Sequence, residues 1–140
     1  MKNFIPLLIL GALMAGLPFA FAAEHVKGDK PQRVAFGQKI KIEDYLVPGK
    51  TTIVDFTSRF CPPCQAIAPH LDKLHEKRAD IAVVAVDINR PEVQGIDWQS
   101  PVARQFDLHS IPHFRVYGPD GKLVADGDKA EEMVVGWFDE

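Results

Sequence analysis

The sequence predicts an α/β sandwich in which a mixed β-sheet is flanked by helices. Two apolar runs of strand length, residues 51–56 and 81–86, lie on either side of a stretch with helical periodicity. Strand, helix and strand at this spacing indicate a right-handed parallel βαβ unit. Two later apolar runs flank the turn sequence Gly118-Pro119-Asp120-Gly121, which is typical of an antiparallel hairpin. Parallel and antiparallel pairs together make the expected sheet mixed.

Length and composition predict one globular domain. The chain has 140 residues, of which 46% are hydrophobic and 25% are charged. Lys and Arg number 16 against 19 Asp and Glu, so the formal net charge is −3, and there is no basic run that could neutralise a series of phosphates. The composition therefore argues against a nucleic-acid partner.

Residues 1–22 have the pattern of a secretory signal peptide. Lys2 is the one charged residue before Glu24, and residues 4–17 are almost wholly apolar. Ala20-Phe21-Ala22 then matches a cleavage site, so the mature domain is expected to cover residues 23–140. The alternative is an uncleaved inner-membrane anchor, because the apolar stretch with its flanks approaches the roughly 20 residues that span a bilayer.

The first half of the mature domain is expected to contain a polar arm, a buried strand and a helix. The arm covers residues 24–31, and the β-branched run that begins at Thr51 predicts the strand. Apolar residues recur at helical spacing over 61–79, so we predict a helix that is kinked at Pro69, where one backbone hydrogen bond is lost. The helix also carries two histidines that are expected at the surface, on its mixed face: His70 and His75.

The second half is expected to alternate strands with short helices. An irregular excursion over 89–99 follows the strand at 81–86, because this stretch contains a proline and a glycine. Ser100-Pro101 is typical of the start of a short helix. The remaining elements are strands over 113–117 and 122–125 and a final helix, whose start resembles a capping box of Asp128 and Glu131.

The two cysteines, Cys61 and Cys64, are separated by two prolines at the expected start of the first helix. Unpaired N–H groups and the positive end of the helix dipole then lie beside Cys61 and favour its thiolate. Pro62 and Pro63 suit this first turn, where a missing donor costs little. We predict that Cys61, at the exposed tip, attacks a substrate disulfide and that the shielded Cys64 resolves the mixed disulfide.

Two other roles for the cysteines compete with this interpretation. Zinc binding is the first, because Cys61-x2-Cys64 and His109-x3-His113 match zinc-ligand spacing in outline. A whole βα unit separates the two pairs, however, and the prolines remove backbone donors that would support metal-bound thiolates. An inert structural disulfide is the second.

These motifs together resemble the thioredoxin superfamily, and most of all its exported bacterial thiol:disulfide oxidoreductases. The likeness extends from Ile40 to the C-terminus and rests on VDF-TSRF-CPPC, Pro69, the VVAVDIN strand end, SIPHF and the GPDG turn. It implies a thioredoxin-like three-layer sandwich, a redox-active Cys61–Cys64 disulfide, and neither a cofactor nor a metal.

The resemblance also implies where substrates bind. Pro112 corresponds to a cis-proline that faces the disulfide, and Ile111 to the residue whose backbone pairs with an extended substrate peptide. Phe60 and Pro62, beside the cysteines, are expected to contact the substrate. The family commonly has tryptophans where Thr57 and Phe60 stand, and thioredoxin itself has glycine in place of Pro62, so substrate choice is expected to differ.

Asp55 corresponds in this resemblance to a buried acid that exchanges a proton with Cys64. Since Asp55 lies in an apolar strand, burial is expected to raise its pKa and prepare it to act as a base. The alternative is a polar residue at the end of a strand, facing solvent. A lysine that the family often has near this acid has no evident counterpart, because Ala85 occupies its place.

The sequence therefore predicts an enzyme that exchanges dithiol and disulfide with protein substrates in the periplasm, as a reductant. A strong oxidant needs a stabilised thiolate in its reduced form, and the sequence has no cation between the cysteines to supply that stabilisation. A membrane-bound electron donor and a monomeric state complete the expectation. The alternative function is a metal-binding or metal-handover module that uses Cys61 and Cys64.

Overall fold

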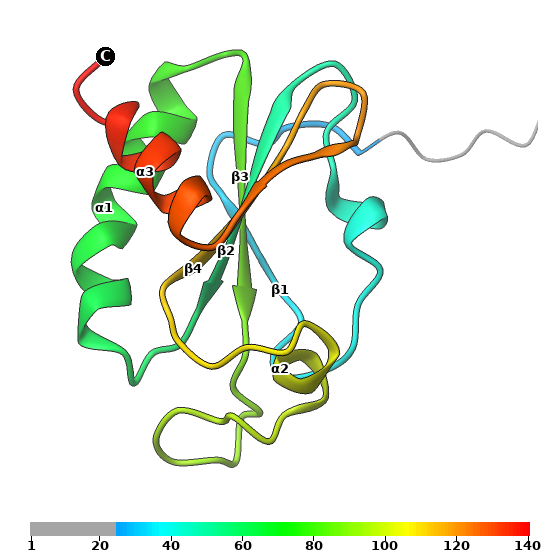
Figure 1. Cartoon of the computed structure of the whole chain (residues 1–140), viewed down its shortest axis with the longest axis vertical. Coiled ribbons are helices and arrows are strands. Elements are labelled where there is room, and N and C mark those ends of the chain that lie inside the picture. The colour runs from blue at the N-terminus through cyan, green and yellow to red at the C-terminus, as the bar shows by residue number, and fades with distance from the viewer. Residues whose placement is uncertain (1–24) are drawn as a thin grey trace, which may run out of the picture.

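The computed structural model describes residues 25–140, so the signal peptide predicted at residues 1–22 lies outside the described residues (Figure 1). Strands and helices alternate along most of the described chain. In order they are β1 (Gln32–Val34), the 3-10 helix η1 (Ile42–Tyr45), β2 (Thr51–Thr57), α1 (Pro62–Lys77), β3 (Ile81–Asp87), α2 (Pro101–Gln105), β4 (His113–Tyr117), β5 (Leu123–Asp126) and α3 (Asp128–Gly136).

The strands form one mixed sheet in the order β1-β3-β2-β4-β5. β1, β3 and β2 run parallel, and β4 and β5 join antiparallel to them and to each other. Helices α1 and α3 cover one face of this sheet, whereas α2 and η1 lie on the other (Figure 1). The predicted three-layer α/β sandwich with a mixed sheet is confirmed.

Two hydrophobic clusters lie on opposite faces of the sheet. Because side chains alternate along a strand, neighbours in β2 enter different clusters. Val54 and Phe56 pack on the side of α2, and Ile53 packs on the side of α1 and α3. β2 and β3 are therefore buried on both faces, which explains why their sequences are continuous apolar runs instead of alternating ones.

The start of α2 agrees with the sequence and the start of α3 differs from it. α1 continues through Pro69, so the proline does not end the helix, and the kink there stays a prediction. Ser100 caps α2 as predicted, since its side chain accepts a hydrogen bond from the backbone N–H of Ala103 at 3.1 Å. The capping box predicted from Asp128 is wrong: Gly127 is the N-cap of α3 and has a φ of 60°, and Asp128 lies one position inside the helix. A left-handed N-cap is a conformation that glycine adopts without strain.

His75 is buried, 2% exposed, which corrects the prediction that it lies at the surface. Its Nδ1 accepts a hydrogen bond from the backbone N–H of Val83 at 2.9 Å, and its Nε2 lies 2.8 Å from the carbonyl oxygen of Gly28. Lys27 donates from Nζ to the backbone carbonyls of His75 and Arg78 at the end of α1. His75 and Lys27 thus fasten the N-terminal arm to α1 and β3.

We expect acid to weaken this attachment. Burial lowers the pKa of His75, so the unfolded chain takes up a proton first and stability falls as the pH drops from about 6.5 through the folded pKa. His75→Gln should lose this pH-dependent component of stability. At pH 7.5 its free energy of unfolding should be lower than that of the wild type by roughly 1–3 kcal/mol, so it should unfold at a lower urea concentration. Urea unfolding at pH 7.5 and pH 5 checks both statements. His70→Gln, at an exposed position on the same helix, is the control and should keep the wild-type pH dependence. An unchanged pH dependence of stability in His75→Gln would contradict the role of His75.

Candidate active site

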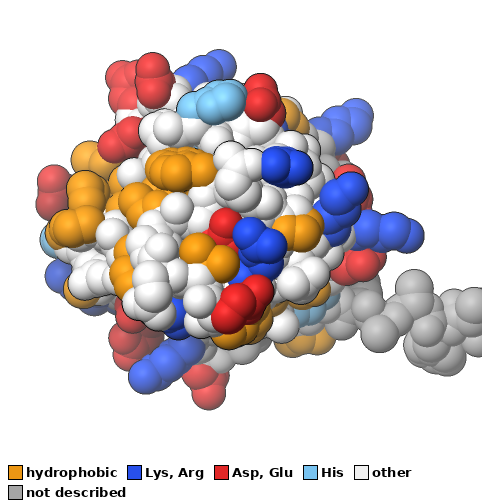
Figure 2. All heavy atoms as spheres, turned by 90° about the horizontal axis from the view of Figure 1, so that it is seen from below, with side chains coloured by type: hydrophobic (Ala, Val, Ile, Leu, Met, Phe, Trp, Pro, Cys, Tyr) orange, Lys and Arg blue, Asp and Glu red, His pale blue; other side chains and the backbone are white. Residues whose placement is uncertain are grey.

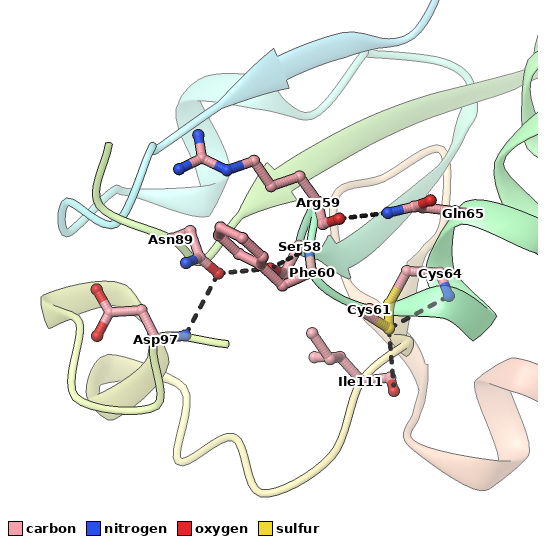
Figure 3. Close-up of a disulfide and its surroundings, with 9 residues drawn as sticks. All are labelled: Ser58, Arg59, Phe60, Cys61, Cys64, Gln65, Asn89, Asp97 and Ile111. Atoms are coloured by element: carbon pink, nitrogen blue, oxygen red, sulfur yellow. Dashed lines mark hydrogen bonds between the residues drawn. A yellow bond between two sulfur atoms is a disulfide. The ribbon is translucent and has the colours of Figure 1, made fainter. Parts of the chain in front are cut away.

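Cys61 and Cys64 form a disulfide at the start of α1, next to the end of β2 (Figure 3). Cys61 is the N-cap of the helix, and Pro62 and Pro63 begin its first turn. The Cα atoms of the two cysteines are 5.3 Å apart. The spacing of two residues therefore brings the sulfurs together, as the sequence predicts.

The prolines determine which backbone donor reaches the Cys61 sulfur. Pro62 and Pro63 have no N–H, so the first donor that the helix offers is the N–H of Cys64. It donates to Cys61 Sγ at 3.2 Å (Figure 3). After reduction this donor and the positive end of the helix dipole face the same sulfur and favour its thiolate. The arrangement supports Cys61 as the nucleophile.

Both cysteines are buried, since Cys61 is 2% exposed and Cys64 is 1% exposed. The expectation that Cys61 lies at an exposed tip is therefore wrong for the disulfide form. The sulfur is enclosed because the segment before Pro112 packs against it: the carbonyl oxygen of Ile111 lies 3.6 Å from Cys61 Sγ (Figure 3). A substrate must approach across the groups that surround the disulfide.

Those surrounding groups are the ones predicted to contact substrate. Pro62 is exposed, and Phe60, Ile111 and Pro112 are half-buried. The Ile111-Pro112 peptide bond is cis, as the resemblance implies. Apolar side chains also gather on one half of the face seen from this end of the molecule (Figure 2). The disulfide thus lies within a rim of apolar and backbone groups suited to an extended peptide, although their contact with substrate stays a prediction.

Asp55 is buried in β2 and 3% exposed, so the alternative of a solvent-facing residue at a strand end is wrong. It lies on the same face of β2 as Ile53, whose cluster includes Leu71 and Leu74 of α1. Cys64 is buried on this helix two turns before Leu71, so both side chains belong to the layer between sheet and helix. Among residues 25–140, Asp55 Oδ1 has no hydrogen-bond partner. Burial raises the pKa of Asp55 from 3.8 to about 7, and the charge of Arg33 opposes this rise. An acid with such a pKa can accept and return a proton near neutral pH.

A polar network that no sequence motif predicts supports the active-site loop. Ser58 donates from its hydroxyl to Asn89 Oδ1, and the same oxygen accepts from the backbone N–H of Asp97 (Figure 3). Ser58 Oγ in turn accepts from the backbone N–H of Phe60 at 3.1 Å. The excursion at 89–99 is therefore connected to the loop that carries Phe60. Its Pro and Gly are the one sequence signal, and they indicate irregular backbone but no partner.

The histidines of the zinc hypothesis have other neighbours. His109 Nε2 lies 3.1 Å from Asp107 Oδ1, and His113 Nε2 lies 2.8 Å from Asp126 Oδ1. Within residues 25–140, no three His, Cys, Asp or Glu side chains gather in a metal-binding arrangement. Nor does any helix of this part of the chain have the length and apolar character needed to cross a membrane.

Comparison with known proteins gives one consistent result. Residues 33–137 match the family model described as thioredoxin. Thioredoxin H-type of Brassica campestris is 35% identical over 87 residues, which are 62% of this chain and 58% of that protein, so the match spans less than two thirds of the relative. Thioredoxin-1 of Schizosaccharomyces pombe is 31% identical over 85 residues, covering 61% of this chain and 68% of that protein. A mutant thioredoxin from Halobacterium salinarum NRC-1 has the same fold, with a TM-score of 0.56 at 19% identity over 79% of this chain and 89% of that one.

Proposed function

Since this chain belongs to the thioredoxin family, we propose that it is a thiol:disulfide oxidoreductase that reduces disulfides of protein substrates outside the cytoplasm. The observation that carries the proposal is the Cys61–Cys64 disulfide with the N–H of Cys64 directed at Cys61 Sγ. A structural disulfide has no need of a donor that stabilises one of its sulfurs after reduction.

The reaction begins with the reduced protein. The Cys61 thiolate attacks one sulfur of a substrate disulfide, and the other substrate sulfur leaves as a thiolate that takes up a proton from solvent. Asp55, as a carboxylate, accepts the proton of the Cys64 thiol. The Cys64 thiolate then attacks Cys61 Sγ, the mixed disulfide breaks, and the second substrate thiol is released after protonation. Two electrons pass to the substrate, and the protein is left in the disulfide form seen in the structure.

Export and electron supply are part of the same proposal. The signal-like pattern of residues 1–22 supports secretion to the periplasm, where disulfides persist. A soluble pool of reductant is poor in such a compartment, so a membrane-bound donor is the fitting source of electrons. In this proposal the domain acts as a monomer that meets electron donor and substrate in turn.

The reduction potential of the Cys61/Cys64 pair tests the proposed direction of the reaction. Equilibration with glutathione buffers, read by the alkylated fraction in mass spectra, should give a value below roughly −200 mV, in the range of known reductants. A value near roughly −120 mV would make the protein an oxidant. Titration of the reduced protein with zinc and copper under nitrogen, beside an assay of protein-disulfide reduction, separates the second candidate: metal binding without reduction would favour a metal-handover module.

A further inference from the structure

A cation faces the region of Asp55 from an edge strand, although the sequence predicts none beside this acid. Arg33 of β1 pairs in register with Ala85 of β3, and Ala85 pairs with Asp55 of β2. Register partners lie on the same face of a sheet, so Arg33 and Asp55 flank Ala85 on the face that α1 covers. Since neighbouring strands lie about 4.8 Å apart, their backbones are separated by about 10 Å.

The sheet is partly exposed to solvent at the small side chain of Ala85. Ala85 is half-buried, whereas the other six residues of β3 are buried. A crevice of about 490 Å³ lies beside this place, between the sheet and the start of α1, and Asp55 itself lies behind its wall. Its wall includes Arg33, Thr57 and Asp87 from the sheet side and Cys64 from the helix. A second cation in the wall, Arg59, donates from Nη2 to the backbone carbonyl of Pro91 at 3.1 Å. Water can thus reach the neighbourhood of the inner cysteine from the side of β1.

Asp87 fixes the position of the Arg33 guanidinium. Nε and Nη2 of Arg33 both donate to Asp87 Oδ2, at 3.0 and 2.8 Å. Oδ1 of Asp87 accepts from the backbone N–H of Asn89 at 3.0 Å, so the carboxylate is itself held. The Arg33 charge is therefore anchored on Asp87, at a distance from Asp55, and makes no direct ion pair with it.

Among the described residues, Arg33 is the cation that acts on Asp55. On the described part of β4, the register partner of Asp55 is Phe114, which has no charge. From β3 the facing groups are Ala85 and, two residues on, the anion Asp87; from α1 the titratable group is Cys64 when reduced. The charge of Arg33 lowers the pKa of Asp55 against the larger rise that burial causes.

We propose that Arg33 is a positioning residue for proton transfer between Cys64 and Asp55: anchored on Asp87, it holds a positive charge at the mouth of the crevice and stabilises the Asp55 carboxylate without pairing with it. This inference rests on the proposed function. A direct ion pair would keep the carboxylate ionised and make it a weak base, and no cation at all would leave the acid protonated. The Arg33–Asp87 pair sets the base strength of the Asp55 carboxylate between these two limits.

Substitutions of Arg33 and of Asp87 should shift the titration midpoint of Asp55 in opposite directions. In Arg33→Gln the carboxylate loses its cation, so the titration midpoint of Asp55 should rise by about one pH unit. In Asp87→Asn an anion is removed and the guanidinium is released, so the midpoint should fall. Arg33→Lys should restore most of the wild-type midpoint. The measurement is the ¹³C NMR titration of the carboxyl of Asp55 in the oxidised protein, assigned by its absence in Asp55→Asn.

The control is Arg78→Gln, which removes an arginine that pairs with Asp80 and Glu140 at the far end of α1. It should leave the midpoint unchanged. The pH at which protein-disulfide reduction is half-maximal should move with the NMR midpoint in each variant. A midpoint that stays at the wild-type value in both Arg33→Gln and Asp87→Asn overturns the proposal and makes the pair purely structural. Because the NMR titration needs no turnover, shifted midpoints in an inactive protein would support the coupling while refuting the proposed function.

Discussion

Cys61→Ser is expected to abolish reduction of protein disulfides, with a rate at least about 1000-fold below that of the wild type, because a serine hydroxyl is not ionised near neutral pH and cannot replace the thiolate. Cys64→Ser should instead capture its substrates. Its Cys61 thiolate still attacks, but nothing resolves the mixed disulfide. Non-reducing gels and mass spectra of the isolated protein should show stable adducts at Cys61 in Cys64→Ser.

The two serine variants are controls for one another. Each lacks the disulfide and has exchanged one sulfur for oxygen, so any difference in trapping reports the role of the sulfur that remains. In the reduced wild type, iodoacetamide should modify Cys61 faster than Cys64 near pH 7, since the N–H of Cys64 and the helix dipole act on Cys61 Sγ. Equal labelling of both cysteines, or equal trapping by both variants, would contradict the assignment of nucleophile and resolving residue.

Asp55→Asn should make the oxidised protein more stable at pH 8 and lose this advantage near pH 3. Burial raises the pKa of Asp55 from 3.8 to about 7. The contribution of Asp55 to folding stability is therefore fully present below its unfolded pKa and is lost as the pH rises through its folded pKa. The rise of about three units corresponds to a gain on the order of 4 kcal/mol at most for the uncharged amide. Guanidinium unfolding of both proteins at pH 8 and pH 3 measures the difference.

The same substitution should slow turnover by about 100-fold, since Cys64 loses its base while Cys61 still attacks. Mixed disulfides should consequently accumulate in Asp55→Asn during reduction of a substrate. Asp139→Asn, an exposed carboxylate near the C-terminus, is the matched control and should change neither quantity. If Asp55→Asn is less stable at pH 8 and turns over at the wild-type rate, Asp55 is an ordinary structural residue.

The parts of the fold that the sequence predicts best are those with a local cause. The runs that became β2 and β3 are apolar throughout because both faces of each strand are buried, and Ser100-Pro101 carries its own cap. Cys61 and Cys64 could be identified because chemistry at the start of a helix requires close spacing. The burial of Asp55 could be predicted because it lies within a run of apolar residues that form a buried strand.

The features that no local sequence pattern predicts depend on partners far away in the chain. His75 looks like a surface residue by helical periodicity, but the arm at Gly28 and the N–H of Val83 surround it. Arg33 approaches Asp55 through the sheet order, which places β1 beside β3, and no local pattern predicts that neighbour. The burial of Cys61 likewise depends on Ile111, 50 residues further along the chain. Such contacts follow from topology, which single residues do not encode.

The attachment of the N-terminal arm also determines where a tether joined to that arm would lie relative to the disulfide. Lys27 is bonded to the carbonyls of His75 and Arg78 at the last turn of α1, whereas the disulfide lies at the first turn. A helix of 16 residues is roughly 24 Å long. A tether at this arm, natural or engineered, therefore leaves the domain at the pole opposite the sulfurs, so that a protein immobilised there presents its reactive end outward.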